Sequence, residues 1–166
     1  MSQREIRAFD YVNQAYEPVR ERLKKEAQNI FQRATKLAED RSGDLVAALS
    51  VDLAGVRVSR DIKIVVGESR EEKLGGTDLS RITRVPLEWQ AAASPGLFPA
   101  MKAELSVFPL SFSETQVELR GHYGPPLGIL GGALDAVVGH RIAEASVHRF
   151  LHSVVERLRQ ELAASR

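Results

Sequence analysis

The sequence contains no cysteine, which excludes disulfide bonds, thiolate metal sites and cysteine nucleophiles. The sequence also carries almost no net charge, because it holds 23 Lys and Arg and 22 Asp and Glu. Such a balance gives no electrostatic reason to expect nucleic acid as a partner. No stretch approaches the roughly 18 uninterrupted apolar residues of a membrane span. The first ten residues, MSQREIRAFD, hold no apolar signal core, so we expect a soluble cytoplasmic protein.

What remains is the composition of an ordinary folded protein. Hydrophobic residues make up 43% and charged residues 27% of the 166 positions, which argues against disorder. This length suits one hydrophobic core, and the sequence holds no internal repeat or low-complexity segment. We therefore expect a single domain over residues 1–166.

The first third of the sequence predicts a strand and then a helix. Glu5–Asn13 is rich in β-branched and aromatic residues, which indicates a short strand. Pro18 stands where a first helical turn tolerates it. Apolar residues then follow at helical spacing, namely Val19, Leu23, Ala27, Ile30, Phe31, Ala34, Leu37 and Ala38. We expect one long helix, or two with a bend, ended by the SGD at 42–44.

From Leu45 the apolar spacing changes to two, which is typical of strands. Leu45–Leu53 and Val56–Val66 form a predicted hairpin around a turn at Ala54 and Gly55. The polar, glycine-containing sequence GESREEKLGGTD at 67–78 predicts a mobile loop.

Three more strands and a helix complete the prediction. The strands are ITRVPLEWQA at 82–91, Met101–Val107 and Thr115–Tyr123, with a turn at Phe108–Ser113 between the last two. Pro86 inside a strand indicates an edge position or a bulge. A helix over about 127–164 follows, with an apolar stripe of Val147, Phe150, Leu151, Val154, Leu158 and Leu162. Strands that follow one another favour an antiparallel sheet with the helices on one face.

This order and three stretches of sequence resemble a known superfamily. The stretches are RITRVPLEWQAA, FPAMKAELSVFPLSFSETQVELRGHYGPPLGILGGALD and the helical FLHSVVERLRQEL. They resemble the START-like helix-grip (SRPBCC) superfamily, in its polyketide cyclase/dehydratase and lipid transport branch. The resemblance implies an α+β fold in which a curved antiparallel sheet of six or seven strands wraps around the long C-terminal helix. One or two helices follow the first strand.

The resemblance also implies a cavity between the sheet and the final helix that holds an apolar molecule. Its lining would come from the concave sheet face and from the helix stripe. The candidate lining residues are Trp89, Met101, Leu105, Tyr123, Leu130, Leu134, His140, Glu144, Val147 and Leu151. On this basis we expect a protein that binds or carries a lipid, isoprenoid or polyketide-like compound, as a monomer or homodimer and without a cofactor.

The stretch HYGPPLGILGGALD places four glycines and two prolines before the final helix. It is not a phosphate loop, because it lacks G-x-G and the Lys-Ser/Thr of a P-loop, and no further strand follows it. On a continuous helix Gly128, Gly131, Gly132 and Gly139 would share one side. One interpretation is a loosely wound entry to the helix; the other, which we favour, is a deformable gate at one mouth of the cavity.

His140 and Glu144 are the candidates for chemistry. Extending the helix stripe backward from Val147 places both on the side toward the sheet, where polar groups need partners, water or ligand. This leaves open a cyclase or dehydratase that uses the two as an acid–base pair. We expect a binding protein rather than an enzyme. A third hypothesis is a protein-interaction module, which a filled core and an exposed apolar patch would favour.

His148 and His152 have the four-residue spacing that can hold a metal on a helix. No Glu lies between them in the HExxH manner, and the sequence suggests no third ligand. They fall on the flank and back of the stripe, so we expect solvated histidines and no metal.

Overall fold

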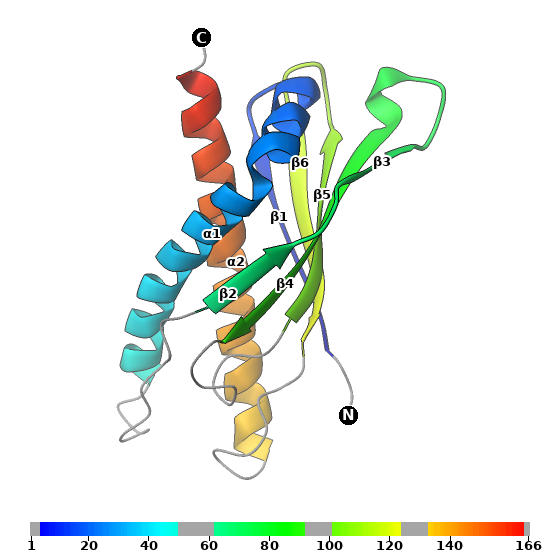
Figure 1. The fold of residues 1–166 in the computed structure, drawn as a ribbon. Helices are drawn as coiled ribbons and strands as arrows, with labels where there is room; N and C mark the ends of the chain where they lie inside the picture. The colour runs from blue at the N-terminus through cyan, green and yellow to red at the C-terminus, as the bar shows by residue number, and fades with distance from the viewer. Residues whose placement is uncertain (1–3, 50–61, 92–100, 124–132, 165–166) are drawn as a thin grey trace.

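In the computed structural model, one antiparallel sheet carries two long helices on the same face (Figure 1). The structure describes residues 4–49, 62–91, 101–123 and 133–164, apart from the side chains of 35–49, 62–63, 78, 89–91, 133–139, 141–143 and 145–146. The strands are β1 Arg4–Val12, β2 Ile62–Val66, β3 Arg70–Lys73, β4 Arg81–Ala91, β5 Met101–Pro109 and β6 Thr115–Tyr123. The helices are α1 Tyr16–Leu49 and α2 Ala133–Ala163, and a short 3-10 helix spans Asp78–Ser80.

The strand order explains how the chain builds one continuous sheet. It runs β1-β6-β5-β4-β2, and β3 also pairs with β4. Every one of these pairs is antiparallel. The expected α+β class and antiparallel sheet of six or seven strands are therefore confirmed, with six strands in the described part of the chain. A single helix follows β1, which decides between the one or two that the sequence left open.

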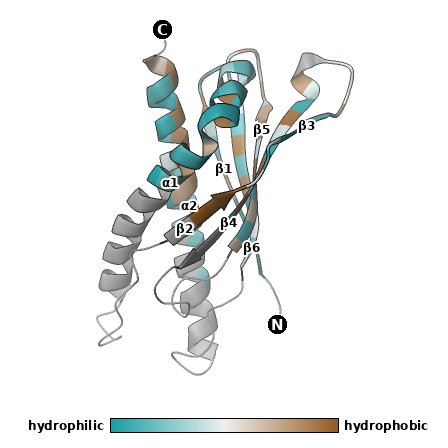
Figure 2. Ribbon diagram, viewed as in Figure 1, coloured by the Kyte–Doolittle hydropathy of each residue, from teal (hydrophilic) through white to brown (hydrophobic). Residues whose placement is uncertain are grey.

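The core lies between the inner face of the sheet and the helices. Side chains of a strand point alternately to the two faces, and along β6 the residues Val117, Leu119 and Tyr123 are at most 1% exposed. The helix stripe predicted from the sequence is confirmed, because Val147, Phe150, Leu151, Val154, Leu158 and Leu162 are all buried. Figure 2 shows the same alternation as hydrophilic and hydrophobic bands along the strands.

The predicted end of the first helix is wrong. α1 continues through Ser42 and Gly43 to Leu49, so the first five residues of the predicted strand Leu45–Leu53 are helical. A glycine inside a helix costs only about 1 kcal/mol relative to alanine. The sequence DLVAAL also consists mostly of Leu and Ala, whose helix propensity is high. An alternation over so few residues does not distinguish a strand from a helix. The rest of that predicted strand lies outside the described residues, and of Val56–Val66 only β2 is described.

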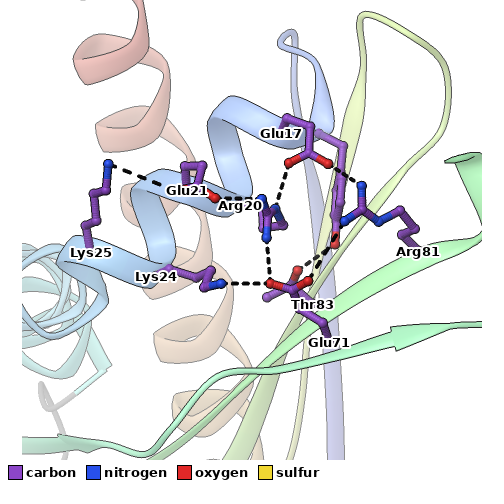
Figure 3. Close-up of polar contacts among 9 residues, drawn as sticks. Glu17, Arg20, Glu21, Lys24, Lys25, Glu71, Arg81 and Thr83 are labelled. Atoms are coloured by element: carbon purple, nitrogen blue, oxygen red, sulfur yellow. Dashed lines mark hydrogen bonds and ion pairs between the residues drawn. The ribbon is translucent and has the colours of Figure 1, made fainter.

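The predicted mobile loop at 67–78 is also wrong in part, because it contains β3. All four β3 residues are exposed, so no apolar pattern marked the strand in the sequence. Ion pairs attach it instead. Glu71 accepts hydrogen bonds from Arg20 at 2.6 Å and from Lys24 at 3.0 Å, both on α1 (Figure 3). Arg81, at the start of β4, bonds Glu17 of α1, so the first turns of α1 are joined to β3 and β4.

We expect this network to make stability depend on acid pH. Hydrogen bonds from Lys24 and Arg20 lower the pKa of Glu71 below the ordinary 4.5. A carboxyl whose pKa is lower in the folded state stabilises the fold above its unfolded pKa, and that contribution disappears as the pH falls through the folded value. The melting temperature of Glu71→Gln should therefore lie below wild type at pH 7 and converge with it in acid.

The control for this test is Glu68→Gln, in the same segment. Glu68 is exposed and makes no ion pair with any residue that the structure describes. Its melting curve should follow wild type throughout. A Glu71→Gln difference that persists unchanged to pH 3 would contradict the role given to the carboxylate, as would its insensitivity to salt at neutral pH.

Pro86 lies opposite a bulge, as one of the two interpretations of the sequence required. β4 is not an edge strand, since it pairs with β5 on one side and with β2 and β3 on the other. Val66 is opposite Leu87 and Arg70 is opposite Arg84, so residues 67–69 face only residues 85–86. The Gly67 N–H donates to the Pro86 carbonyl at 2.8 Å. The edge of Pro86 that lacks an N–H therefore faces the bulge, where the regular pairing with the neighbouring strand is interrupted.

Replacing Gly67 with alanine should lower the free energy of unfolding by about 1 kcal/mol, because a Cβ there would lie 2.8 Å from Pro86 Cγ. Chemical denaturation measures the change. The matched control is Gly76→Ala, where an added Cβ would meet nothing within 4 Å. Equal effects of the two substitutions would show that the bulge does not require a glycine.

Candidate functional site

Both helices and several strands have a described end at the same end of the sheet. α1 ends there and β2 begins, β4 ends and β5 begins, and β6 ends shortly before α2 begins (Figure 1). The register aligns one residue from each of five strands across the inner face at this end. This end row consists of Arg4, Tyr123, Met101, Trp89 and Ile64. Met101, Tyr123 and Ile64 are at most 2% exposed, so the row closes the described core.

The next row inward holds two small residues of the inner face, Gly121 and Ala103, side by side on β6 and β5. They leave no empty space at this point. A Cβ on Gly121 would lie 2.9 Å from Ala103 Cβ and 3.1 Å from Met101 Sδ. Gly121 therefore allows β5 side chains to approach β6 closely, and Met101 folds over it. The end row is therefore the outermost row of the inner face at this end of the described sheet.

A chain of hydrogen bonds links the end row to α2. Tyr123 Oη lies 2.6 Å from His140 Nδ1, and the two rings are nearly parallel, with centroids 6.1 Å apart. His140 Nε2 lies 3.2 Å from Glu144 Oε1, one helical turn further along. A carboxylate only accepts, so in a neutral imidazole Nε2 carries the proton and donates to Glu144. Nδ1 then accepts from the Tyr123 hydroxyl.

The three residues differ sharply in their access to solvent. Tyr123 is 1% exposed, whereas the side chains of His140 and Glu144 are 37% and 50% exposed. His140 thus contacts the sheet through Tyr123, whereas Glu144, which the helix stripe also placed toward the sheet, lies half in solvent. The arrangement places a hydroxyl with an ionisable partner at the edge of an apolar surface. Such a group can orient a ligand, or exchange a proton with one.

The other predicted lining residues divide into two groups. Leu105, Val147 and Leu151 are at most 1% exposed and belong to the packed core. Trp89 lies in β4 and Leu134 in α2, but their side chains are outside the described part, as is Leu130 altogether. Of the predicted gate glycines, Gly128, Gly131 and Gly132 lie outside the described residues. Gly139 lies within α2, whose helix is assigned without a break.

The sequence did not single out Arg4 and Ile64 as members of the end row. Nor did it single out Tyr16 and Thr83, a buried hydrogen-bonded pair between α1 and β4 at 2.6 Å. Strand alternation places Arg4 on the same face as Ile6 and Ala8, which is a signal that could have found it. The Tyr16–Thr83 pair joins residues 67 positions apart and leaves no such signal.

The two histidines with metal-like spacing do not converge. His148 is exposed, and His152 Nδ1 lies 3.2 Å from Asp10 Oδ2 on β1. In the parts of the chain that the structure describes, no three His, Asp or Glu residues are grouped so as to hold a metal ion. That the protein binds no metal stays a prediction.

A groove of about 500 Å³ lies on the outer face of the sheet, away from the helices. Arg120 and His122, which alternate along β6 with the buried Leu119 and Tyr123, line this face and not the inner one. Its charged groups already satisfy one another: Arg7 pairs with Glu118 at 2.9 Å and Arg84 with Glu104 at 2.9 Å. These carboxylates raise the pKa of both arginines. A ligand would have to displace such pairs, so the groove is a cross-strand charge ladder and not a second site.

The architecture is similar to that of solved structures. The crystal structure of TTHA0849 from Thermus thermophilus covers 98% of this chain and 100% of its own, with 18% identity and a TM-score of 0.50. A START superfamily protein from Mycobacterium smegmatis covers 96% and 99%, with 9% identity and a TM-score of 0.45. The chain shares the α+β fold of TTHA0849, in which an antiparallel sheet packs against a long C-terminal helix. The Zhui aromatase/cyclase from Streptomyces sp. R1128 covers 99% and 98%, with 11% identity and a TM-score of 0.39.

The sheet order and the two helices confirm the helix-grip architecture expected from the sequence, and at 18% identity the likeness to TTHA0849 extends to the fold alone. No protein-family model matches the sequence, and no curated protein matches it. Neither helix, in the part that the structure describes, is long and apolar enough to cross a membrane.

Proposed function

We propose that this helix-grip protein binds an apolar small molecule, such as a lipid, isoprenoid or polyketide-like compound, in a cavity between the sheet and α2. The observation that carries the proposal is the end row with its polar corner. Ile64 and Met101 are apolar residues of the end row, and beside them the buried Tyr123 hydroxyl is bonded to the partly exposed His140. Small-molecule sites combine an apolar lining with a few placed polar groups in this way.

The described core supports the location of this cavity. Farther from the end row the inner face is filled, since Leu105, Leu119, Val147 and Phe150 are all at most 1% exposed. A ligand has no room among these side chains, so we place the proposed cavity at the end row, beside the polar corner of Tyr123 and His140. The sequence has no cysteine for the disulfides that are common in small secreted domains, and we propose that the protein acts in the cytoplasm.

Fluorescence titration with N-phenyl-1-naphthylamine, a neutral apolar probe, tests the proposal. We expect saturable binding that Met101→Gln weakens, because this change places an amide in the end row at nearly constant length. The control is Phe112→Ser, which alters an exposed side chain in the turn between β5 and β6. Probe binding that is lost in Phe112→Ser and unchanged in Met101→Gln would assign it to the outer surface and overturn the proposal.

A second candidate function is a cyclase- or dehydratase-type enzyme at the same place. The hydrogen-bonded chain of Tyr123, His140 and Glu144 favours it, because the imidazole can pass a proton between its two neighbours. A carrier releases its ligand unchanged, whereas an enzyme releases a product of different mass or connectivity. Mass spectrometry and NMR of a bound compound before and after incubation distinguish the two.

A further inference from the structure

The end row is polar at one side and apolar at the other. Arg4 and Tyr123 are neighbours on β1 and β6, while Met101 and Ile64 lie on β5 and β2. His140 reaches the polar side from α2 through its bond to Tyr123. A molecule that lies along this row would meet the hydrogen-bonding groups of Tyr123 and His140 at one end and hydrocarbon along the rest.

The hydrogen bonds at the polar side have two arrangements. With a neutral His140, the Tyr123 O–H donates to Nδ1 while Nε2–H donates to Glu144. If His140 gains a proton, Nδ1 becomes a donor to the Tyr123 oxygen, and the Tyr123 O–H must turn to another acceptor. A carboxylate next to Tyr123 would supply that acceptor, and would receive the stronger, charge-assisted type of hydrogen bond.

We infer that the ligand is an amphipathic organic acid, whose carboxylate accepts from Tyr123 and whose binding takes up a proton at His140. This rests on the proposed function, because it names the ligand class of the same site. The charges agree with it. The described groups that face His140 are Tyr123 of β6 and Glu144 of α2, with Arg4 of β1 beside Tyr123. A proton at His140 places one positive charge between the ligand carboxylate and Glu144.

Calorimetric titration with matched pairs of ligands tests the inference. The probes are dodecanoic acid with dodecan-1-ol, and 1-naphthoic acid with 1-naphthalenemethanol, so that each pair shares one apolar body. We expect the acids to bind about tenfold tighter than the alcohols near pH 6. Their Kd should rise with pH, by up to about tenfold per pH unit, across the range in which imidazoles generally lose a proton, and the uptake of about one proton should appear as a dependence of the heat on the buffer. The alcohols should bind without either effect.

Two variants locate the effect on the residues named. Tyr123→Phe keeps the ring and removes the hydroxyl, and His140→Gln keeps hydrogen-bonding capacity but cannot take up a proton. Both variants should abolish the proton uptake and bring the Kd values of the acids close to those of the alcohols. His122→Gln is the control, because His122 is the adjacent residue on β6 but lines the outer face. Circular dichroism melting shows whether each variant is folded.

The outcomes separate this inference from the proposed function. If acids and alcohols bind equally at all pH values, the site takes apolar molecules but the inference is overturned. It is overturned also if proton uptake persists in folded His140→Gln. If none of the four probes binds to the wild-type protein, the proposed function fails and the inference with it. A preference for the acids that disappears in Tyr123→Phe and remains in His122→Gln supports both.

Discussion

Replacing Phe150 with alanine is expected to lower the free energy of unfolding by about 3–5 kcal/mol. Phe150 of α2 is 1% exposed and meets Phe31 of α1 edge to face, with ring centroids 5.8 Å apart. The substitution removes this ring from between the two helices and leaves a cavity that the neighbouring helices and sheet cannot fill. Urea denaturation followed by circular dichroism gives the change.

The matched control is Phe112→Ala, because Phe112 is 85% exposed and its loss should change stability by less than about 0.5 kcal/mol. A loss below about 1 kcal/mol for Phe150→Ala would mean that the helices repack freely. The core between α1 and α2 would then not be the rigid layer against which the end row is positioned.

Thr83→Val should lower the free energy of unfolding by about 2 kcal/mol, although it removes only one hydroxyl. Thr83 is fully buried and bonds Tyr16 Oη at 2.6 Å, and Tyr16 itself is 6% exposed. Valine fills the same volume but leaves the Tyr16 hydroxyl without its partner in an apolar surrounding. The cost is therefore the desolvation of a buried polar group rather than a loss of packing.

A double-mutant cycle provides the control for this prediction. Tyr16→Phe removes the other hydroxyl and keeps the ring, over which the Arg81 guanidinium lies at 5.7 Å from the centroid. The double variant should be more stable than the sum of the single changes predicts, by about 1 kcal/mol or more. Additive effects would show that the two hydroxyl groups do not depend on each other.

Most of the fold could be predicted because its signals are local. Alternation along residues 101–107 and 115–123 gave the central strands, and the stripe from Val147 to Leu162 gave the buried side of α2. The failures have a physical cause. Leu and Ala at 45–49 satisfy helix and strand patterns equally over so short a run. β3 is held by ion pairs from Arg84, Arg20 and Lys24, which create no apolar period.

The candidate site was predictable by residue but not by arrangement. Tyr123 and His140 stood out separately, as an aromatic residue on a strand and as a polar residue on the inner side of a helix. Their bond joins residues 17 positions apart and depends on how α2 crosses the end of β6. The partial exposure of Glu144 likewise depends on the rotation of α2 about its axis. Sequence periodicity determines that rotation only to within a residue or so.

The central claim is that an apolar small molecule occupies this fold. Native mass spectrometry of the protein purified without detergent, combined with analysis of an organic extract, tests it most directly. The account predicts a population heavier than the chain by the mass of one lipophilic compound, which is recovered in the extract and binds again to the stripped protein. A protein found only at the mass of the chain, with an empty extract and no rebinding of added lipophiles, would contradict it.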